Sequence, residues 1–165
     1  MLKIALNLNR LSTLFNGDFR PILDVARRAD ERGFDQIVVS DHLALIPDGY
    51  ENYPYGEFTV KPDAPMAEAI TLLSAVAAVT KQARLSMSVL IAPLRPALLL
   101  AKQLSMLDVL SNGRIDAALG AGWQREEFEA AEREFEGRFA YLEEQVDACR
   151  VLWANAPASF KGKRV

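Results

Sequence analysis

The chain contains few of the residues from which disulfides and metal sites are built. Its 165 residues include a single cysteine, Cys149, and a single histidine, His42. A lone cysteine excludes an internal disulfide and favours a reducing compartment, so we expect a cytoplasmic protein. A lone histidine excludes most zinc sites, which combine several histidine or cysteine ligands, so we expect no bound metal.

The sequence also lacks long apolar runs and a strong excess of charge. Its longest apolar stretches, such as residues 98–101, are far shorter than the roughly 20 residues that a membrane-spanning helix needs. The 19 basic and 22 acidic residues leave a net charge of −3. Such a balance provides no basic surface field for nucleic acid or an anionic membrane, and we expect neither as a partner.

Strand and helix patterns alternate along this half-apolar chain. Apolar residues alternate or run together at 2–9, 36–40, 84–91 and 114–119, as in strands. Helical spacing follows each of these segments, and the helices are expected from about 18–21 to 33, from 63–65 onward, at 96–110, and around 139–153. The order βαβαβαβα predicts an α/β protein with parallel strands and right-handed crossovers.

The pattern by itself fits either an open sheet or part of a barrel. Small polar residues interrupt the strands at Asn7, Ser86 and Ser88, whereas central strands of an open sheet are usually continuously apolar. That favours a (β/α)8 barrel, of which four units would be one half, because a whole barrel typically has about 250 residues. In either fold, the loops that leave the strands gather at one edge, where active sites lie.

Gly120-Ala121-Gly122 follows the fourth strand and invites comparison with nucleotide-binding loops. A dinucleotide fingerprint requires a third glycine where Arg125 stands, and an acidic residue about 20 positions later, and neither is present. Two glycines allow the backbone to approach a flat ligand and leave amide donors free. A tight strand-to-helix turn without a ligand explains them equally well.

A series of short motifs, in the same order and spacing, resembles the bacterial luciferase-like monooxygenase family. The series covers nearly the whole chain, and its similarity is greatest to the branch that uses the deazaflavin coenzyme F-420, with FMN-dependent members next. The segments that carry the resemblance are 40–43 (SDHL), 72–80 (LLSAVAAVT), 88–90 (SVL), 93–95 (PLR), 100–103 (LAKQ), 107–114 (LDVLSNGR), 120–123 (GAGW) and 126–128 (EEF).

The resemblance implies a TIM-barrel fold, of which residues 1–165 would be a single luciferase-like domain truncated after about four β/α units. It implies an oxidoreductase or monooxygenase that transfers hydride or activates oxygen on a small organic substrate. The alternative is a non-catalytic half-barrel fragment or binding subunit. Open sheet edges and an apolar inner layer would promote association, so we expect a homo-oligomer or a second half-barrel as partner.

The resemblance also assigns roles to individual residues. It implies that His42 is catalytic, exchanging a proton with the substrate, and that a cis peptide at Ser88–Val89 supports the flat ring of FMN or coenzyme F-420. The residues implied to bind the cofactor are Asp41, Ser88, Val89, Gly120, Ala121 and Gly122. Its phosphate anchor lies largely in the second half of the family barrel, so tight cofactor binding by this chain alone is not expected.

Aromatic and acidic residues near these motifs admit two interpretations each. Trp123 and Tyr53 are candidate substrate-binding residues, and Tyr50, Tyr53 and Tyr55 could form a lid. Packing within the turn and the long loop explains all of them as well. Glu126 and Glu127 could be paired acid–base carboxylates of a glycosidase. They lie in a run of glutamates up to 136, so a solvated acidic helix face is the preferred interpretation.

Overall fold

The computed structural model describes residues 2–9 and 11–165, and their contacts divide the chain into two compact units. The first unit contains the chain up to His42 together with residues 63–90 and 106–119. The second unit contains residues 43–62, 91–105 and 120–165. No helix among the described residues is both long enough and apolar enough to cross a membrane.

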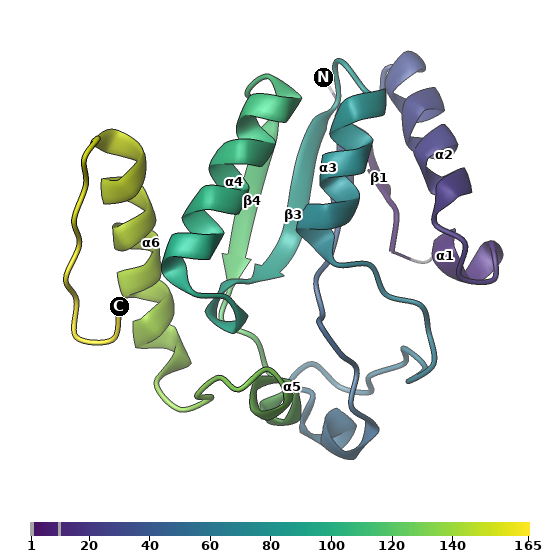
Figure 1. Ribbon diagram of the computed structural model, residues 1–165. Coiled ribbons are helices and arrows are strands. Elements are labelled where there is room, and N and C mark those ends of the chain that lie inside the picture. Colours follow the sequence, from purple (N-terminus) through teal and green to yellow (C-terminus); the bar gives the residue numbers. More distant parts are fainter. Residues whose placement is uncertain (1, 10) are drawn as a thin grey trace. The chain divides into compact units, whose positions relative to one another are not determined.

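A four-stranded parallel sheet forms the centre of the first unit (Figure 1). Its strands are β1 (Ala5–Asn7), β2 (Gln36–Val39), β3 (Arg84–Ile91) and β4 (Ile115–Gly120), which lie side by side in chain order. The division between the units falls just before the last residue of β3 and of β4. The predicted parallel α/β fold is confirmed, although β1 is shorter than the strand expected at 2–9.

One face of this sheet carries the core of the first unit. Ile37 lies opposite Leu85 and Val39 opposite Met87, and all four side chains are buried. Helices α2 (Arg20–Glu31) and α3 (Ala69–Val79) pack against each other and cover this face (Figure 1). The buried residues that they contribute include Ile22, Ala26, Leu73 and Val76.

The opposite face of the sheet is less apolar than expected for the inner layer of a barrel. Side chains alternate between the two faces of a strand, so the residues between the buried ones point to this second face. The register aligns Asn7 with Val38 and Val38 with Ser86. The predicted inner layer of Leu, Val and Ile is therefore wrong here, because polar and small side chains alternate with the apolar core positions.

Asp30, at the end of α2, joins that helix to the segment that enters β3. Its side chain is 4% exposed, and its carboxylate accepts backbone N–H groups of Lys81, Gln82 and Ala83 at 2.8, 2.9 and 2.6 Å. Burial is the largest single influence and raises the pKa of Asp30. The three N–H donors and the Arg114 guanidinium together outweigh it, so the pKa lies below its ordinary value.

Arg114, just before β4, makes a second set of connections at the same amino-terminal edge of the sheet. Its guanidinium donates to the carbonyl oxygens of Ala77, Thr80, Ala83 and Ser111 at 2.7–3.3 Å. It therefore satisfies carbonyls at the ends of α3 and α4 (Ala97–Ser111), which have no partner within their own helix. The helix-to-strand connections of the first unit are thus held by two buried or half-buried charged side chains.

The second unit contains α5 (Arg125–Ala130), α6 (Arg138–Ala154) and the short 3-10 helices η1 (Pro47–Asn52) and η2 (Ala92–Leu94). Its core is formed by Ile91, Leu94 and Phe128, against which Ala131 and Phe135 pack. Helix α6 contacts η2. There the buried Gln145 amide donates to the carbonyl oxygens of Ala92 and Arg95 at 3.1 and 2.8 Å.

The largest error in the predicted boundaries concerns the start of α3. The sequence places it at 63–65, whereas the helix begins at Ala69, where the Glu68 carboxylate accepts the N–H groups of Ile70 and Thr71. A side-chain acceptor at this point satisfies first-turn donors, and it fixes the start of the helix. The short helices α1 (Leu11–Leu14), η1 and η2 were not expected either.

Candidate functional site

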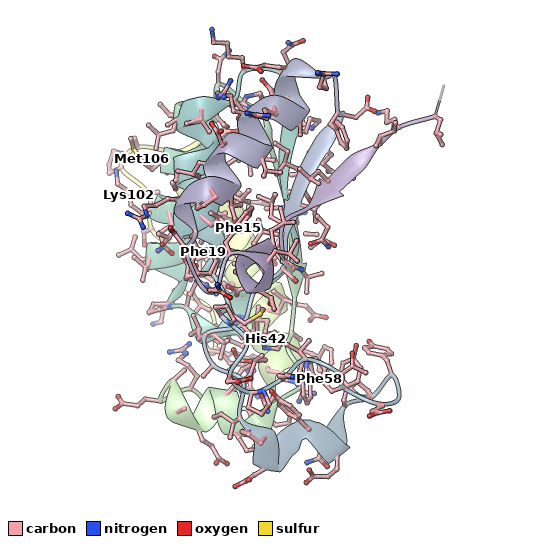
Figure 2. The ribbon with its side chains drawn as sticks, turned by 90° about the vertical axis from the view of Figure 1, so that its right-hand side faces the viewer. Phe15, Phe19, His42, Phe58, Lys102 and Met106 are labelled. Atoms are coloured by element: carbon pink, nitrogen blue, oxygen red, sulfur yellow. The ribbon has the colours of Figure 1, made fainter. Side chains whose placement is uncertain are left out.

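The exits of β1 and β2 are joined by side-chain hydrogen bonds within the first unit. Asn9, just after β1, accepts the Ser40 N–H on its Oδ1 atom at 2.7 Å, and its Nδ2 donates to the Ser40 hydroxyl. Ser40 is followed by Asp41, which is 2% exposed, and by the half-buried His42 (Figure 2). Asn9 therefore supports the segment that carries the candidate imidazole, and the sequence interpretation did not single it out.

Ser88 and Val89 form an uncovered patch within β3. Both are exposed, Val89 by 43%, although Met87 and Leu90 on either side of them are fully buried. The Ser88–Val89 peptide bond is cis, as the resemblance implied. Val39, the last residue of β2, lies opposite Met87, so the chain that continues from β2 at Ser40 starts next to Ser88 of β3.

The glycine turn after β4 is closely packed by protein side chains. Gly122 has a φ of +78°, and a Cβ atom there would lie 2.7 Å from Ile91 Cγ2 and 2.8 Å from Phe128 Cε2. Ala121 is 8% exposed, and the Gly122 carbonyl accepts from Arg138 Nε at 3.1 Å. Packing against these side chains therefore explains a glycine at position 122 without a bound ligand.

Trp123 and Tyr53 meet in an aromatic cluster of the second unit. Phe58 (labelled in Figure 2) packs against both, with its ring centroid 5.0 Å from that of Trp123 and 4.9 Å from that of Tyr53. Tyr53 and Trp123 also contact directly, with centroids 5.0 Å apart. Phe58 was missed, although it belongs to the same aromatic-rich loop as the tyrosines. The cluster shows that the loop packs on the residue following the glycine turn.

Tyr50 joins this cluster from the 3-10 helix η1. Its ring centroid lies 4.9 Å from that of Phe58, in an edge-to-face arrangement. Its hydroxyl is buried and has no hydrogen-bond partner among residues 2–9 and 11–165, and burial raises the pKa of the phenol. The loop tyrosines thus differ in environment, because Tyr55 is 83% exposed.

Glu127 contradicts the expected solvated acidic face. Its side chain is 1% exposed, and its Oε1 atom accepts the N–H groups of Leu43 and Ala44 at 2.6 and 3.3 Å. The prediction is wrong because this side of α5 faces the segment after His42 instead of solvent. Of the three glutamates of α5, Glu126 is half-buried, Glu127 is buried and Glu129 is exposed.

Gln124, at the start of α5, binds the same segment two residues further on. It is fully buried, its Oε1 accepts the Ile46 N–H at 3.4 Å, and its Nε2 donates to the Ile46 carbonyl. Helix α5 therefore supplies polar partners to the backbone of residues 43–46. The sequence spacing between residues 43–46 and α5 does not predict these contacts.

A hollow of about 470 Å³ lies elsewhere in the first unit, against α2. Its charged lining is engaged in ion pairs, since Arg27 contacts Asp24 at 3.0 Å and Glu31 at 2.7 Å. It contains none of the residues selected from the sequence. Those residues instead form two groups, with Asp41, His42, Ser88 and Val89 at one edge of the sheet in the first unit. The second unit holds Tyr53 and Trp123 in one cluster beside the glycine turn.

Parallel β/α units with polar side chains at the strand exits define an α/β protein. The family model of the luciferase-like monooxygenases matches residues 4–165. The chain therefore belongs to the luciferase-like monooxygenase family.

Two curated relatives illustrate the range of the family. The chain is 34% identical over 148 residues to the F-420-dependent glucose-6-phosphate dehydrogenase of Amycolatopsis mediterranei (strain U-32), covering 87% of this chain and 40% of that protein. It is 36% identical over 101 residues to the pyrimidine monooxygenase RutA of Pseudomonas syringae pv. syringae, covering 58% of this chain and 28% of that one. The chain thus spans less than half the length of these relatives.

Solved structures agree on the fold. The monooxygenase RslO1 from Streptomyces bottropensis matches with a TM-score of 0.76 and 30% identity, over 98% of this chain and 46% of that one. An F-420-dependent secondary alcohol dehydrogenase matches with a TM-score of 0.68, over 98% of this chain and 45% of the other. Its 24% identity supports the shared fold alone. The described sheet and helices therefore correspond to part of a luciferase-like TIM barrel.

Proposed function

We propose that the chain provides one side of the active site of an oxidoreductase that uses FMN or coenzyme F-420 on a small organic substrate. The observation that carries this proposal is the exposed Ser88–Val89 segment of β3, which lies in the sheet next to the end of β2, from which Asp41 and His42 follow. Relatives named as an F-420-dependent dehydrogenase and as monooxygenases support the same class of reaction.

The chemistry of these residues suits a flat ring with polar edges. Val89 offers an exposed apolar surface between the exposed Ser88 and the buried Leu90, which a ring face would cover favourably. Ser88 offers an exposed polar group beside it, whereas the Asp41 side chain is 2% exposed. In the second unit, Gly120 and Ala121 offer backbone groups at the exit of β4. Since the space beside Gly122 is filled by side chains, we assign that residue the shaping of the turn that carries its neighbours.

His42 is the residue that we assign to proton exchange. A histidine donates or accepts a proton near neutral pH, as a substrate must when hydride leaves or arrives. A bound flavin would supply oxygen activation or hydride transfer, and a bound deazaflavin would supply hydride transfer. We assign Tyr53 and Trp123, with Phe58, to an aromatic surface for the substrate, because such rings bind apolar groups and offer polar edges.

Titration with each oxidised cofactor tests the proposal. We expect a change in the fluorescence of FMN or of coenzyme F-420 when the chain is added, with weak affinity. Val89→Asp should raise the Kd by more than about tenfold, because covering a carboxylate with a ring is costly. Val109→Asp is the matched control, since Val109 is an exposed valine of α4, outside the site. Binding of neither cofactor would favour the non-catalytic alternative, and equal affinity of the two variants would contradict the assigned surface.

We also infer that the sheet edges are covered in the functional protein, by a second copy of the chain or by a second half-barrel. In the described part of the chain, β1 and β4 are the outer strands, and neither pairs with a further strand on its outer side. Unpaired strand edges promote association. Light scattering that finds a well-folded monomer of 18.3 kDa would contradict this inference.

A further inference from the structure

We propose that Glu127 is a positioning residue for His42, holding the backbone directly after the imidazole in one orientation. The proposal rests on the role assigned to His42 above. Its evidence is the buried Glu127 carboxylate, whose Oε1 atom accepts the N–H groups of Leu43 at 2.6 Å and Ala44 at 3.3 Å.

The Leu43 N–H belongs to the peptide unit that contains the Cα atom of His42. A peptide unit is planar, so its six atoms move together. Fixing the Leu43 N–H therefore also restricts the Cα atom from which the His42 side chain extends. The bond to the Ala44 N–H fixes the next peptide unit, and Gln124 fixes Ile46 through both its N–H and its carbonyl.

The side chains of Leu43 and Ala44 contribute little to the order of this segment. The Leu43 side chain is 45% exposed and the Ala44 side chain is exposed as well, so burial of their own apolar groups contributes little to their order. Leu43 lies outside helices and strands, where no regular ladder supplies an acceptor for its N–H. The Glu127 carboxylate supplies the acceptor for the N–H groups of both Leu43 and Ala44.

Glu127 is a buried carboxylate that accepts hydrogen bonds from backbone N–H groups. A buried carboxylate is costly unless it receives hydrogen bonds, and the exposed Glu129 of the same helix incurs no such cost. Hydrogen bonds to a carboxylate are roughly twice as strong as those between neutral groups. A buried glutamate at this position therefore gives a firmer attachment than an apolar residue, and it acts on the two peptide units next to His42.

Nuclear magnetic resonance of the chain without cofactor tests this proposal directly. His42 is the single histidine, so its imidazole gives one unambiguous set of signals. In Glu127→Ala, we expect the Leu43 and Ala44 amides to exchange with solvent about 10- to 100-fold faster, as expected for loss of hydrogen bonds to a charged acceptor. We also expect the His42 imidazole signals to shift and broaden. Glu129→Ala is the matched control and should change neither.

Glu127→Gln keeps the length of the side chain and one oxygen, and it guards against a variant that does not fold. Both N–H groups donate to Oε1, so an amide oxygen can still accept them. We expect partial rescue, with exchange rates between those of the parent and Glu127→Ala. If Glu127→Ala folds and leaves amide exchange and imidazole signals unchanged, the proposal is wrong. The same holds if Glu127→Gln folds and exchanges as fast as a fully exposed segment. Since no cofactor is present, these outcomes are independent of whether FMN or coenzyme F-420 binds.

Discussion

Replacing Asp30 by asparagine should destabilise the first unit, because the carboxylate receives three backbone N–H groups. Oδ1 accepts from Gln82 and Ala83, and Oδ2 accepts from Lys81. Asparagine keeps one oxygen for the first pair but turns an NH2 group toward the Lys81 N–H. One charge-assisted hydrogen bond is then lost, and the other two become neutral.

The expected loss in the free energy of unfolding is about 2–4 kcal/mol at about pH 7, since hydrogen bonds to charged groups contribute about 1.5–3 kcal/mol each. The difference should depend on pH with a definite sign. The folded-state pKa of Asp30 lies below its ordinary value. Its contribution is therefore complete above the unfolded pKa of about 3.9 and is lost as the pH falls through the folded-state value.

Urea unfolding followed by circular dichroism measures this difference. Asp24→Asn is the matched control on the same helix, because the Asp24 side chain is 58% exposed and its ion pair with Arg27 lies at the surface. Exposed pairs contribute little, so the control should unfold close to the parent. The deficit of Asp30→Asn should shrink in acid. A deficit below about 0.5 kcal/mol at neutral pH, the range of ordinary surface substitutions, would refute the reasoning.

Three further predictions concern the second unit. In thermal unfolding, Gly122→Ala should lower the free energy of unfolding by about 1–3 kcal/mol more than Gly33→Ala. Both glycines have a φ of +78°, but of the two only Gly33 has open space for a Cβ atom. Equal losses of stability in the two variants would contradict the packing argument. Cys149 is 1% exposed and burial raises the pKa of its thiol, so a disulfide reagent should modify it only after denaturant is added, and rapid labelling of the folded chain would be inconsistent with its burial. Trp153→Phe removes the indole donor to the Ala101 carbonyl at 3.0 Å and should cost about 1 kcal/mol in urea unfolding; an unchanged midpoint would show that water replaces the bond.

Local sequence patterns predicted those helices and strands whose ends are determined by residues close to them in the sequence. The strand at 84–91 was placed to the residue, because apolar residues recur along it between the small polar Ser86 and Ser88. The helix expected from about 18–21 was observed as Arg20–Glu31, with Pro21 in its first turn and Gly33 after its end. The start of α3 was misplaced, since Asp63 and Pro65 resemble a helix start as closely as Glu68 does.

The site was harder to predict because its supporting contacts join distant parts of the chain. Glu127 is separated from Leu43 by 84 positions and Asn9 from Ser40 by 31. A glutamate within an acidic run gives no local sign that a distant backbone segment will cover it. Phe58 was likewise overlooked, although the aromatic content of its loop was the signal that could have found it.

Asp30 and Arg114 have a consequence for how this fold can change over evolutionary time. Both act where chain segments enter the sheet, at the edge opposite the exits that carry His42 and Val89. Substitutions in the exit loops therefore leave these attachments intact, and substitutions that disturb the attachments leave the reacting groups chemically unchanged. A lineage built on such a scaffold can acquire new substrates by loop replacement without first having to rebuild what keeps it folded.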